Sequence, residues 1–263
     1  MHDYWIAVVQ GIVEGLTEFL PVSSTGHLIL AGELMKFEGP KAETFEIIIQ
    51  LGAILAVVIL YWNRIMSLLS FKKSSSSNLN LKHIIVAILP AMILGLLLHK
   101  VIKNYLFSPY TVLIGLVVGG LFMIYAEKRH VPVQTDTIDD LSYKQAFSIG
   151  LFQCLALWPG FSRSGATIAG GLLVGTNHKT AANFSFLIAI PMMIAASGYD
   201  LLKSYKLLSM DDLVFFLIGF FVSFIVALLA VVTFLKLLEK LKLSAFAYYR
   251  FIVAILFWLF ILK

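Results

Sequence analysis

Long runs of apolar side chains alternate with short polar stretches along the chain. Crossing the hydrocarbon core of a membrane takes about 20 consecutive apolar residues. Polar clusters such as Asn63-Arg64 and Glu127-Lys128-Arg129 end individual runs. The pattern predicts transmembrane helices at residues 43–63, 83–101, 109–126, 181–202, 212–235 and 245–262.

Two further segments, residues 4–35 and 144–175, are apolar but are interrupted by Pro, Gly and hydroxyl side chains. They align with each other without a gap at a constant offset of 139 residues, which indicates an internal duplication. Glu14 falls opposite Gln153 in this alignment. Identical pairs are Ala7 and Ala146, Gly11 and Gly150, Leu16 and Leu155, Ser23 and Ser162, Gly26 and Gly165, Gly32 and Gly171, Ala42 and Ala181, and Phe45 and Phe184.

The two interrupted segments are separated by three predicted spans, and an odd number of spans inverts the second copy relative to the first. Non-helical backbone at membrane depth survives only where it is buried in protein or lines a wet cavity. We therefore expect turns at Leu20-Pro21-Val22 and Trp158-Pro159-Gly160, with their tips facing each other inside the bundle.

The predicted fold is an all-α polytopic membrane protein with six transmembrane helices and two re-entrant helix pairs in an inverted-topology repeat. One membrane domain covers residues 1–263. The first repeat covers about residues 1–128 with its re-entrant pair at 4–35, and the second covers about 140–263 with its pair at 144–175.

The polar connections set the expected orientation. Those at residues 64–82, 127–145, 176–180 and 236–244 hold eleven Lys and Arg residues, against seven in the connections and terminus of the other side. By the positive-inside rule the richer side is cytoplasmic, so both termini lie outside. Residues 72–80 are expected to form an exposed linker. Asp140 is expected to cap the helix that follows it.

Composition agrees with a membrane protein. Hydrophobic residues make up 60% of the 263 residues and charged residues 13%, whereas soluble domains carry about 25% charged residues. The net charge of +5 lies mainly between the apolar runs, where it suits anionic lipid headgroups rather than nucleic acid. The single cysteine, Cys154, excludes an internal disulfide and a cysteine-based zinc site.

The first interrupted segment carries two carboxylates, Glu14 and Glu18, which project from one helix face because they are four residues apart. Two like charges inside a membrane need a compensating cation or proton. A hard divalent ion such as Mg²⁺ or Ca²⁺ prefers oxygen ligands. A proton relay and a helix end at the headgroups are the alternatives.

Hydroxyl residues and a histidine follow, in "PVSSTGH". Ser23, Ser24 and Thr25 are good N-cap residues for a helix that restarts after Pro21. The same helix terminus also suits an anion, through its free N–H groups. His27 follows within one turn and is able to act as a general acid or base, although a structural role stays open.

The second interrupted segment reads "LWPGFSRSGAT". Arg163 suits a phosphate group, because an arginine side chain binds phosphate with two parallel hydrogen bonds. Arg163 is also able to pair with Glu18 when no substrate is bound. Carboxylates and hydroxyls on one repeat and a guanidinium on the other suit phosphoryl transfer. The surrounding hydroxyl donors are Ser162, Ser164 and Thr167.

Two sequence signatures, "EGLTEFLPVSSTGH" at 14–27 and "PGFSRSGAT" at 159–167, resemble the undecaprenyl-diphosphate phosphatase family of bacterial inner membranes, the integral enzymes associated with bacitracin resistance. "FEIIIQLGAILAVV" at 45–58 is also similar to that family. The likeness extends over essentially the whole chain. It implies cleavage of undecaprenyl diphosphate to undecaprenyl phosphate and inorganic phosphate, which recycles the lipid carrier for cell-wall synthesis.

The resemblance also implies roles for individual residues. Glu18, Ser24, His27 and Arg163 match the family's catalytic positions, with Ser24 as the favoured nucleophile and Ser23 or Thr25 as alternatives. Glu14 and Glu18 match the glutamates associated with its divalent cation, Mg²⁺ or Ca²⁺. A homodimer in the inner membrane, with its active site open to the periplasm or exterior, is implied by the family alone.

A secondary transporter or lipid flippase is the competing hypothesis, because inverted repeats and broken helices are common in that class. His27 and the hydroxyls go beyond what binding requires, so the enzyme is favoured. Vesicle assays that follow headgroup sidedness separately from phosphate release distinguish the two.

Overall fold

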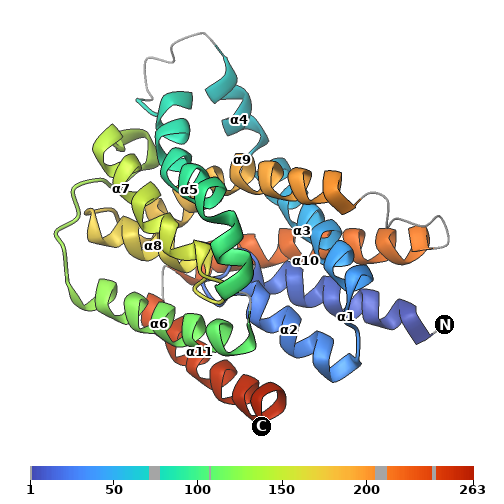
Figure 1. Cartoon of the computed structure of the whole chain (residues 1–263). Helices are drawn as coiled ribbons and strands as arrows, with labels where there is room; N and C mark the ends of the chain where they lie inside the picture. Colours follow the sequence, from blue (N-terminus) through green and yellow to red (C-terminus); the bar gives the residue numbers. More distant parts are fainter. Residues whose placement is uncertain (1, 71–77, 107, 205–211, 239–240) are drawn as a thin grey trace.

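The computed structural model describes residues 2–70, 78–106, 108–204, 212–238 and 241–263, and these residues are almost all helical (Figure 1). The α-helices are α1 (His2–Thr17), α2 (Ser24–Met35), α3 (Pro40–Leu60), α4 (Trp62–Leu69), α5 (Leu81–Val101), α6 (Pro109–Lys128), α7 (Tyr143–Gln153), α8 (Arg163–Leu173), α9 (His178–Ser204), α10 (Leu213–Leu237) and α11 (Leu243–Phe257). Shorter turns of helix are η1 (Ile102–Leu106), η2 (Ile138–Asp140), η3 (Cys154–Leu157) and η6 (Trp258–Leu262).

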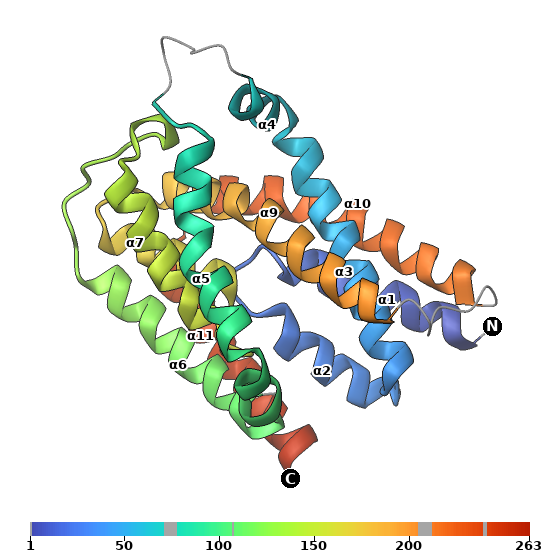
Figure 2. The same ribbon diagram turned by 45° about the horizontal axis from the view of Figure 1, so that its top comes forward.

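Six helices in the described part of the chain are long and apolar enough to cross a membrane, as predicted: α3, α5, α6, α9, α10 and α11. The two ends of the chain lie toward the right and the bottom of Figure 2, and α4 lies at its top. The first predicted span, at about residues 43–63, corresponds to α3, which ends at Leu60. The chain continues past Arg64 as the separate helix α4 to Leu69, and Arg64 forms an ion pair with Asp139.

Each interrupted segment folds as two short helices joined by a turn. In the first, α1 packs on α2, and in the second, α7 packs on α8. The four helices have 16, 12, 11 and 11 residues, and an 11-residue helix is about 17 Å long, roughly half of a hydrocarbon core. The turns cover residues 18–23 and 158–162, at the predicted prolines.

Small residues let the short helices approach the long ones closely. A Cβ atom on Gly11 would lie 2.8 Å from the carbonyl oxygen of Gly219 in α10, and one on Gly15 would lie 2.7 Å from that of Ser223. Gly150, which aligns with Gly11, meets the backbone of α5 at Ala87 in the same way. Such close backbone packing is typical of membrane helices, which gain little from hydrophobic burial against each other.

The connection between α6 and α7 corrects one prediction. Ser142, not Asp140, is the N-cap of α7, and its hydroxyl and Gln145 form a reciprocal capping box. Asp140 instead ends η2, where its carboxylate accepts a hydrogen bond from the Thr137 hydroxyl at 2.7 Å. The extra turn η2 therefore separates Asp140 from the helix that it was expected to cap.

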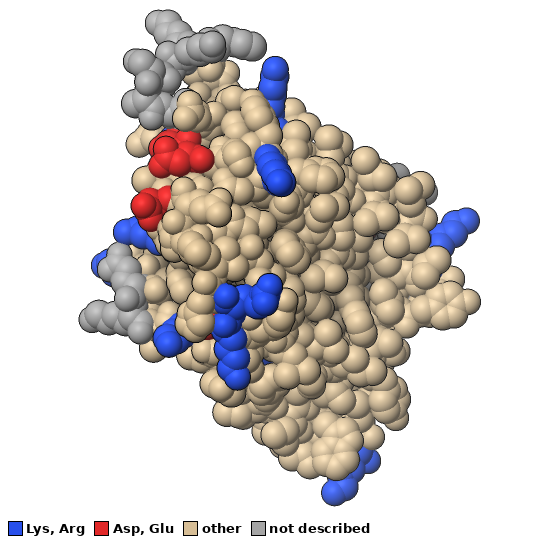
Figure 3. All heavy atoms as spheres, turned by 90° about the vertical axis from the view of Figure 1, so that its left-hand side faces the viewer, with Lys and Arg blue, Asp and Glu red and all other residues tan. Residues whose placement is uncertain are grey.

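The face at α7 and this connection is shown in Figure 3. Lys and Arg side chains gather near its middle and left edge, whereas a wide area toward the lower right carries almost no charge. Beneath the surface, Glu127 joins three elements, because its carboxylate lies 3.0 Å from His178 Nε2 and accepts from the Leu243 N–H at 2.8 Å.

We expect Gly15→Leu to lower the melting temperature of the detergent-solubilised protein strongly, because a Cβ there would already lie within 2.9 Å of Ser223 O, Val226 Cβ and Ala227 N of α10, none of which is the end of a flexible side chain. Overpacking of this kind costs about 1–3 kcal/mol or more. Gly198→Leu is the matched control, because a Cβ at Gly198 meets nothing within 4 Å. Equal melting temperatures for the two variants would contradict the proposed tight contact.

Candidate active site

The two turns meet inside the bundle. The Ser164 hydroxyl donates a 2.7 Å hydrogen bond to the carbonyl oxygen of Leu20. Arg163 Nη2 lies 3.2 Å from Glu18 Oε1, and both side chains are largely buried. The predicted contact between the tips of the two interrupted segments is thus confirmed, including the pairing of Arg163 with Glu18 without substrate.

Glu18 is the centre of this arrangement because both of its oxygens are engaged. Oε1 accepts from Arg163, and Oε2 accepts a 2.6 Å hydrogen bond from the Ser24 hydroxyl. Glu18 lies just after the end of α1, whereas Ser24 and Arg163 are the first residues of α2 and α8. One carboxylate therefore links a hydroxyl of its own turn to the guanidinium of the other.

Arg163 is held on several sides. Its Nη1 lies 3.3 Å from the Ser185 carbonyl oxygen in α9, and its guanidinium carbon lies 5.4 Å from the centre of the Phe19 ring. Its Nε is buried and has no hydrogen-bond partner among the described residues. Phe19 itself packs edge-on against Phe186 in the core.

Ser23 and Ser162 occupy the same position in the two repeats and share an unusual backbone. Their φ angles are 71° and 76°, a region that costs a non-glycine residue about 1–3 kcal/mol and is concentrated at functional sites. The Ser162 hydroxyl caps α8 by accepting from the Gly165 N–H at 3.1 Å. The Ser23 hydroxyl makes no such bond with α2, so helix capping does not explain the positive φ angle of Ser23.

A cavity of about 250 Å³ opens at the meeting point of the turns. Its polar lining contains most of the predicted site residues, and its other side is apolar. The predicted residues that line it are Glu18, Ser23, Ser24, Thr25, Ser162 and Arg163. The further lining residues are Gln50, Ala156, Trp158, Pro159, Gly160, Met192, Met193 and Ala196.

Four predicted site residues lie outside the cavity lining. The hydroxyl of Thr167 lies 2.6 Å from that of Ser185, and Ser164 bonds Leu20, so contact of these two residues with substrate stays a prediction. His27 bonds the Ser23 carbonyl oxygen through Nδ1 at 2.8 Å and the Tyr249 hydroxyl through Nε2 at 2.9 Å. His27 is not among the residues that line the cavity, and its catalytic role stays a prediction.

Glu14, the fourth, is almost fully buried, and neither of its carboxylate oxygens has a hydrogen-bond partner among the described residues. Gln153, its counterpart in the other repeat, also has a buried oxygen without a partner. An unpaired buried carboxylate requires a proton or a cation. The described residues contain no group of three or more His, Cys, Asp and Glu side chains that suits a metal, so a cation here needs further oxygen ligands, such as those of a phosphate.

Sequence reasoning missed Gln50 and Arg250, although both interrupt apolar runs. Gln50 lines the cavity, and its Oε1 accepts a 2.7 Å hydrogen bond from the Ser197 hydroxyl. Arg250 is fully buried behind the second turn and donates to the carbonyl oxygens of Gly160 and Phe161. Each is a polar side chain inside a predicted transmembrane span, and such residues often have a function, so the sequence did carry a signal for both.

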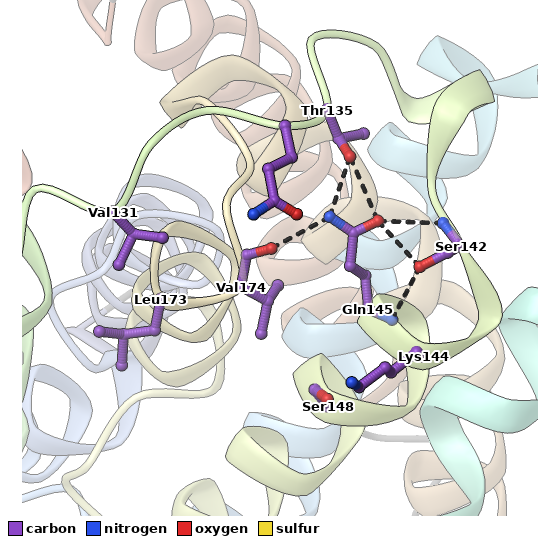
Figure 4. Close-up of a pocket in the computed structure, with 9 residues that line it drawn as sticks. Val131, Thr135, Ser142, Lys144, Gln145, Ser148, Leu173 and Val174 are labelled. Atoms are coloured by element: carbon purple, nitrogen blue, oxygen red, sulfur yellow. Dashed lines mark hydrogen bonds between the residues drawn. The ribbon is translucent and has the colours of Figure 1, made fainter.

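A second cavity, of about 490 Å³, lies at the far end of α7 and α8 from the turns (Figure 4). Its lining includes Thr135, Ser142, Lys144, Gln145 and Ser148. Gln145 is fixed there by bonds to Thr135, Ser142 and the Val174 carbonyl oxygen. None of the predicted catalytic residues lines this cavity, so we place the active site at the turns.

Similarity to known proteins extends along the whole chain. The family described as Bacitracin resistance protein BacA matches residues 7–256, which include both turns. The chain belongs to the BacA family. It is 59% identical to Undecaprenyl-diphosphatase 1 of Bacillus thuringiensis (strain Al Hakam), and also 59% identical to the protein of that name in Bacillus anthracis, with full coverage of each chain. This BacA-family chain is therefore a multi-pass membrane protein.

We expect Arg163→Met to lower the free energy of unfolding by about 3–5 kcal/mol, because it leaves Glu18 buried without its partner. The double variant Arg163→Met/Glu18→Gln should recover part of this loss, as measured by thermal unfolding in detergent.

Arg64→Met is the matched control, because the side chains of Arg64 and Asp139 are 21% and 32% exposed, against 13% and 8% for Arg163 and Glu18. Arg64→Met should lower the free energy of unfolding by no more than about 1 kcal/mol. If the double variant is no more stable than Arg163→Met, the loss of stability does not come from leaving the Glu18 charge without Arg163.

Proposed function

We propose that this BacA-family protein hydrolyses undecaprenyl diphosphate to undecaprenyl phosphate and inorganic phosphate, which recycles the lipid carrier for cell-wall synthesis and confers bacitracin resistance. The names of its full-length relatives support the substrate and the reaction. The observation that carries the proposal is the cavity at which Glu18, Ser24 and Arg163 converge.

The shape of the cavity suits a lipid diphosphate. Hydroxyls, Gln50 and the guanidinium of Arg163 form a side that is able to donate hydrogen bonds to phosphate oxygens. Trp158, Met192 and Met193 also line the cavity and are apolar enough to suit the first isoprene units. The rest of the tail then lies against the apolar spans and the membrane lipids.

The geometry favours Ser24 as the nucleophile and Glu18 as its general base. The Ser24 hydroxyl already donates to Glu18 Oε2 at 2.6 Å. When Ser24 Oγ attacks the terminal phosphorus, its proton passes to Glu18 and the bond to the bridging oxygen breaks, so undecaprenyl phosphate leaves. Glu18 releases that proton to the leaving undecaprenyl phosphate. In the second step Glu18 takes a proton from the attacking water and returns it to Ser24 Oγ as the phosphoserine bond breaks, so inorganic phosphate leaves. Arg163 stabilises the phosphate charge in both steps.

A divalent cation, Mg²⁺ or Ca²⁺, completes this proposal. Glu14 fits it, because its two buried oxygens have no partner among the described residues. Glu18 is able to join it as well, because each of its oxygens accepts one hydrogen bond and keeps a second lone pair. A bound cation supplies positive charge to the phosphate oxygens, as in other phosphoryl-transfer enzymes.

The proposed setting is the bacterial inner membrane, with the site facing the periplasm or exterior and the protein forming a homodimer. We further propose that the two helix pairs are re-entrant halves of an inverted repeat within one domain. The short helices support this, as do the shared positive φ of Ser23 and Ser162 and the matching contacts of Gly11 and Gly150.

Purified protein should release phosphate from long polyprenyl diphosphates with Mg²⁺ or Ca²⁺ present, and a chelator should stop the release. Arg163→Ala and Glu18→Ala should each lose at least about a hundredfold in kcat, because one preorganised charge contact is worth about 2.7–4 kcal/mol. Arg64→Ala, remote from the cavity, should stay near normal. Near-normal turnover in both site variants would refute the site.

Ser24 should carry phosphate when the reaction is quenched in acid with a radiolabelled substrate, and mass spectrometry of peptides would locate it. Ser23→Ala and Thr25→Ala are the controls, since both should still be labelled at Ser24. Label on another hydroxyl would reassign the nucleophile. Turnover without label in Ser24→Ala would favour direct attack by water.

A further inference from the structure

Helix α11 contacts α2 and the second turn through two consecutive residues. The Tyr249 hydroxyl lies 2.9 Å from Nε2 of His27, near the start of α2, and the two rings stack with their centres 5.6 Å apart. Arg250 bonds Gly160 and Phe161 in the second turn. A single helix therefore connects the helix that follows the first turn with the second turn, although the two lie far apart in sequence.

Arg250 has no exposed surface and bonds four backbone carbonyl oxygens. Nη1 donates to Phe161 at 2.8 Å, and Nη2 donates to Gly160 at 2.8 Å and to Gly115 at 3.1 Å. Nε donates to Leu116 at 3.1 Å. No ion pair of Arg250 with a carboxylate occurs in the described part of the chain. A buried cation inside a membrane protein is costly, so residues of this kind usually serve a function.

The packing of α6 makes room for this guanidinium. A Cβ atom on Gly119 would collide with Arg250 Nη2, and one on Gly115 would collide with the carbonyl oxygen of Pro159. The carbonyl groups that Arg250 holds belong to Gly160 and Phe161, and Gly160 has a φ of +90°. Ser162, with its own positive φ, and Arg163 follow directly. The orientation of Arg163 at the start of α8 therefore depends on the anchored turn before it.

Tyr249 acts on the other turn through His27. The carbonyl oxygen of Ser23 only accepts, so His27 Nδ1 carries the proton of that 2.8 Å bond. Nε2 then accepts from the Tyr249 hydroxyl in the neutral ring. The imidazole is thereby locked between α11 and the strained backbone of Ser23, next to Ser24.

We propose that Tyr249 and Arg250 are positioning residues for the phosphatase reaction, Tyr249 by fixing His27 and the Ser23 turn, and Arg250 by fixing the turn that presents Arg163. This inference rests on the proposed function. Neither residue lines the cavity, so each acts through other groups rather than on the substrate. A purely structural role would change stability without changing the turnover of the folded protein.

Tyr249→Phe tests the first contact, since it removes only the hydroxyl. We expect kcat to fall about tenfold, the size of one hydrogen bond, with KM within about twofold. Tyr248→Phe is the matched control on the same helix, because Tyr248 is largely exposed and should keep full activity. In a His27→Gln background, Tyr249→Phe should lower kcat no further, because the Tyr249 hydroxyl acts only by holding the His27 imidazole.

Arg250→Lys tests the second contact, since one ammonium group is unable to reach four carbonyl oxygens. We expect kcat to fall at least about tenfold in protein that remains folded by size exclusion and thermal unfolding, and its effect to be non-additive with that of Arg163→Lys. If Arg250→Lys does not fold, Gly119→Ala disturbs the same contact, because its Cβ would collide with both Arg250 Nη2 and the Phe161 carbonyl oxygen that Arg250 bonds. Gly120→Ala is its control, because its Cβ would instead meet the Phe251 ring.

Normal turnover in Tyr249→Phe, equal losses in Tyr248→Phe, or normal turnover in the folded Arg250→Lys or Gly119→Ala protein would each overturn the inference. Additive effects of Tyr249→Phe and His27→Gln would also do so. These results leave the proposed function intact as long as the unaltered protein releases phosphate. Absence of phosphate release by the unaltered protein would instead refute the function.

Discussion

The site depends on one buried ion pair between Glu18 of the first turn and Arg163 of the second. Either charge alone would destabilise a membrane-embedded bundle, because it would lose its hydration without gaining a partner of opposite charge. Together they compensate each other and join two halves of the chain that are far apart in sequence. The close approach of α1 to α10 at Gly15 and Ser223, and the tight turns at the prolines, serve to bring these two charges within reach.

Backbone polarity imposes the second constraint. Each turn breaks its helix and exposes carbonyl groups that lipid is unable to satisfy. The structure satisfies such groups with side chains from elsewhere in the chain: Ser164 of the second segment donates to Leu20 of the first, and Arg250 of α11 donates to Gly160 and Phe161. Two buried groups stay without a partner among the described residues, the Glu14 oxygens outside the cavity lining and Arg163 Nε. They are the groups that the proposed function assigns to a cation and a phosphate.

Much of this arrangement could be predicted from the sequence, because hydrophobic runs and a duplicated motif are local signals. The six candidate spans, the turns and the Arg163–Glu18 pair follow from such signals. The N-cap of α7 was misassigned to Asp140 because one added helical turn is invisible to sequence pattern. The apolar cavity wall and the carbonyl partners of Arg250 were missed because distant packing, not neighbouring sequence, determines them.

In the proposed reaction, the substrate and Glu18 use the same guanidinium. A diphosphate that takes two parallel bonds from Arg163 competes directly with Glu18 for this group. The bond from the Ser24 hydroxyl reaches the other oxygen of Glu18, so it does not depend on the contact with Arg163. One carboxylate therefore links the proposed nucleophile on the first turn to the proposed phosphate-binding group on the second.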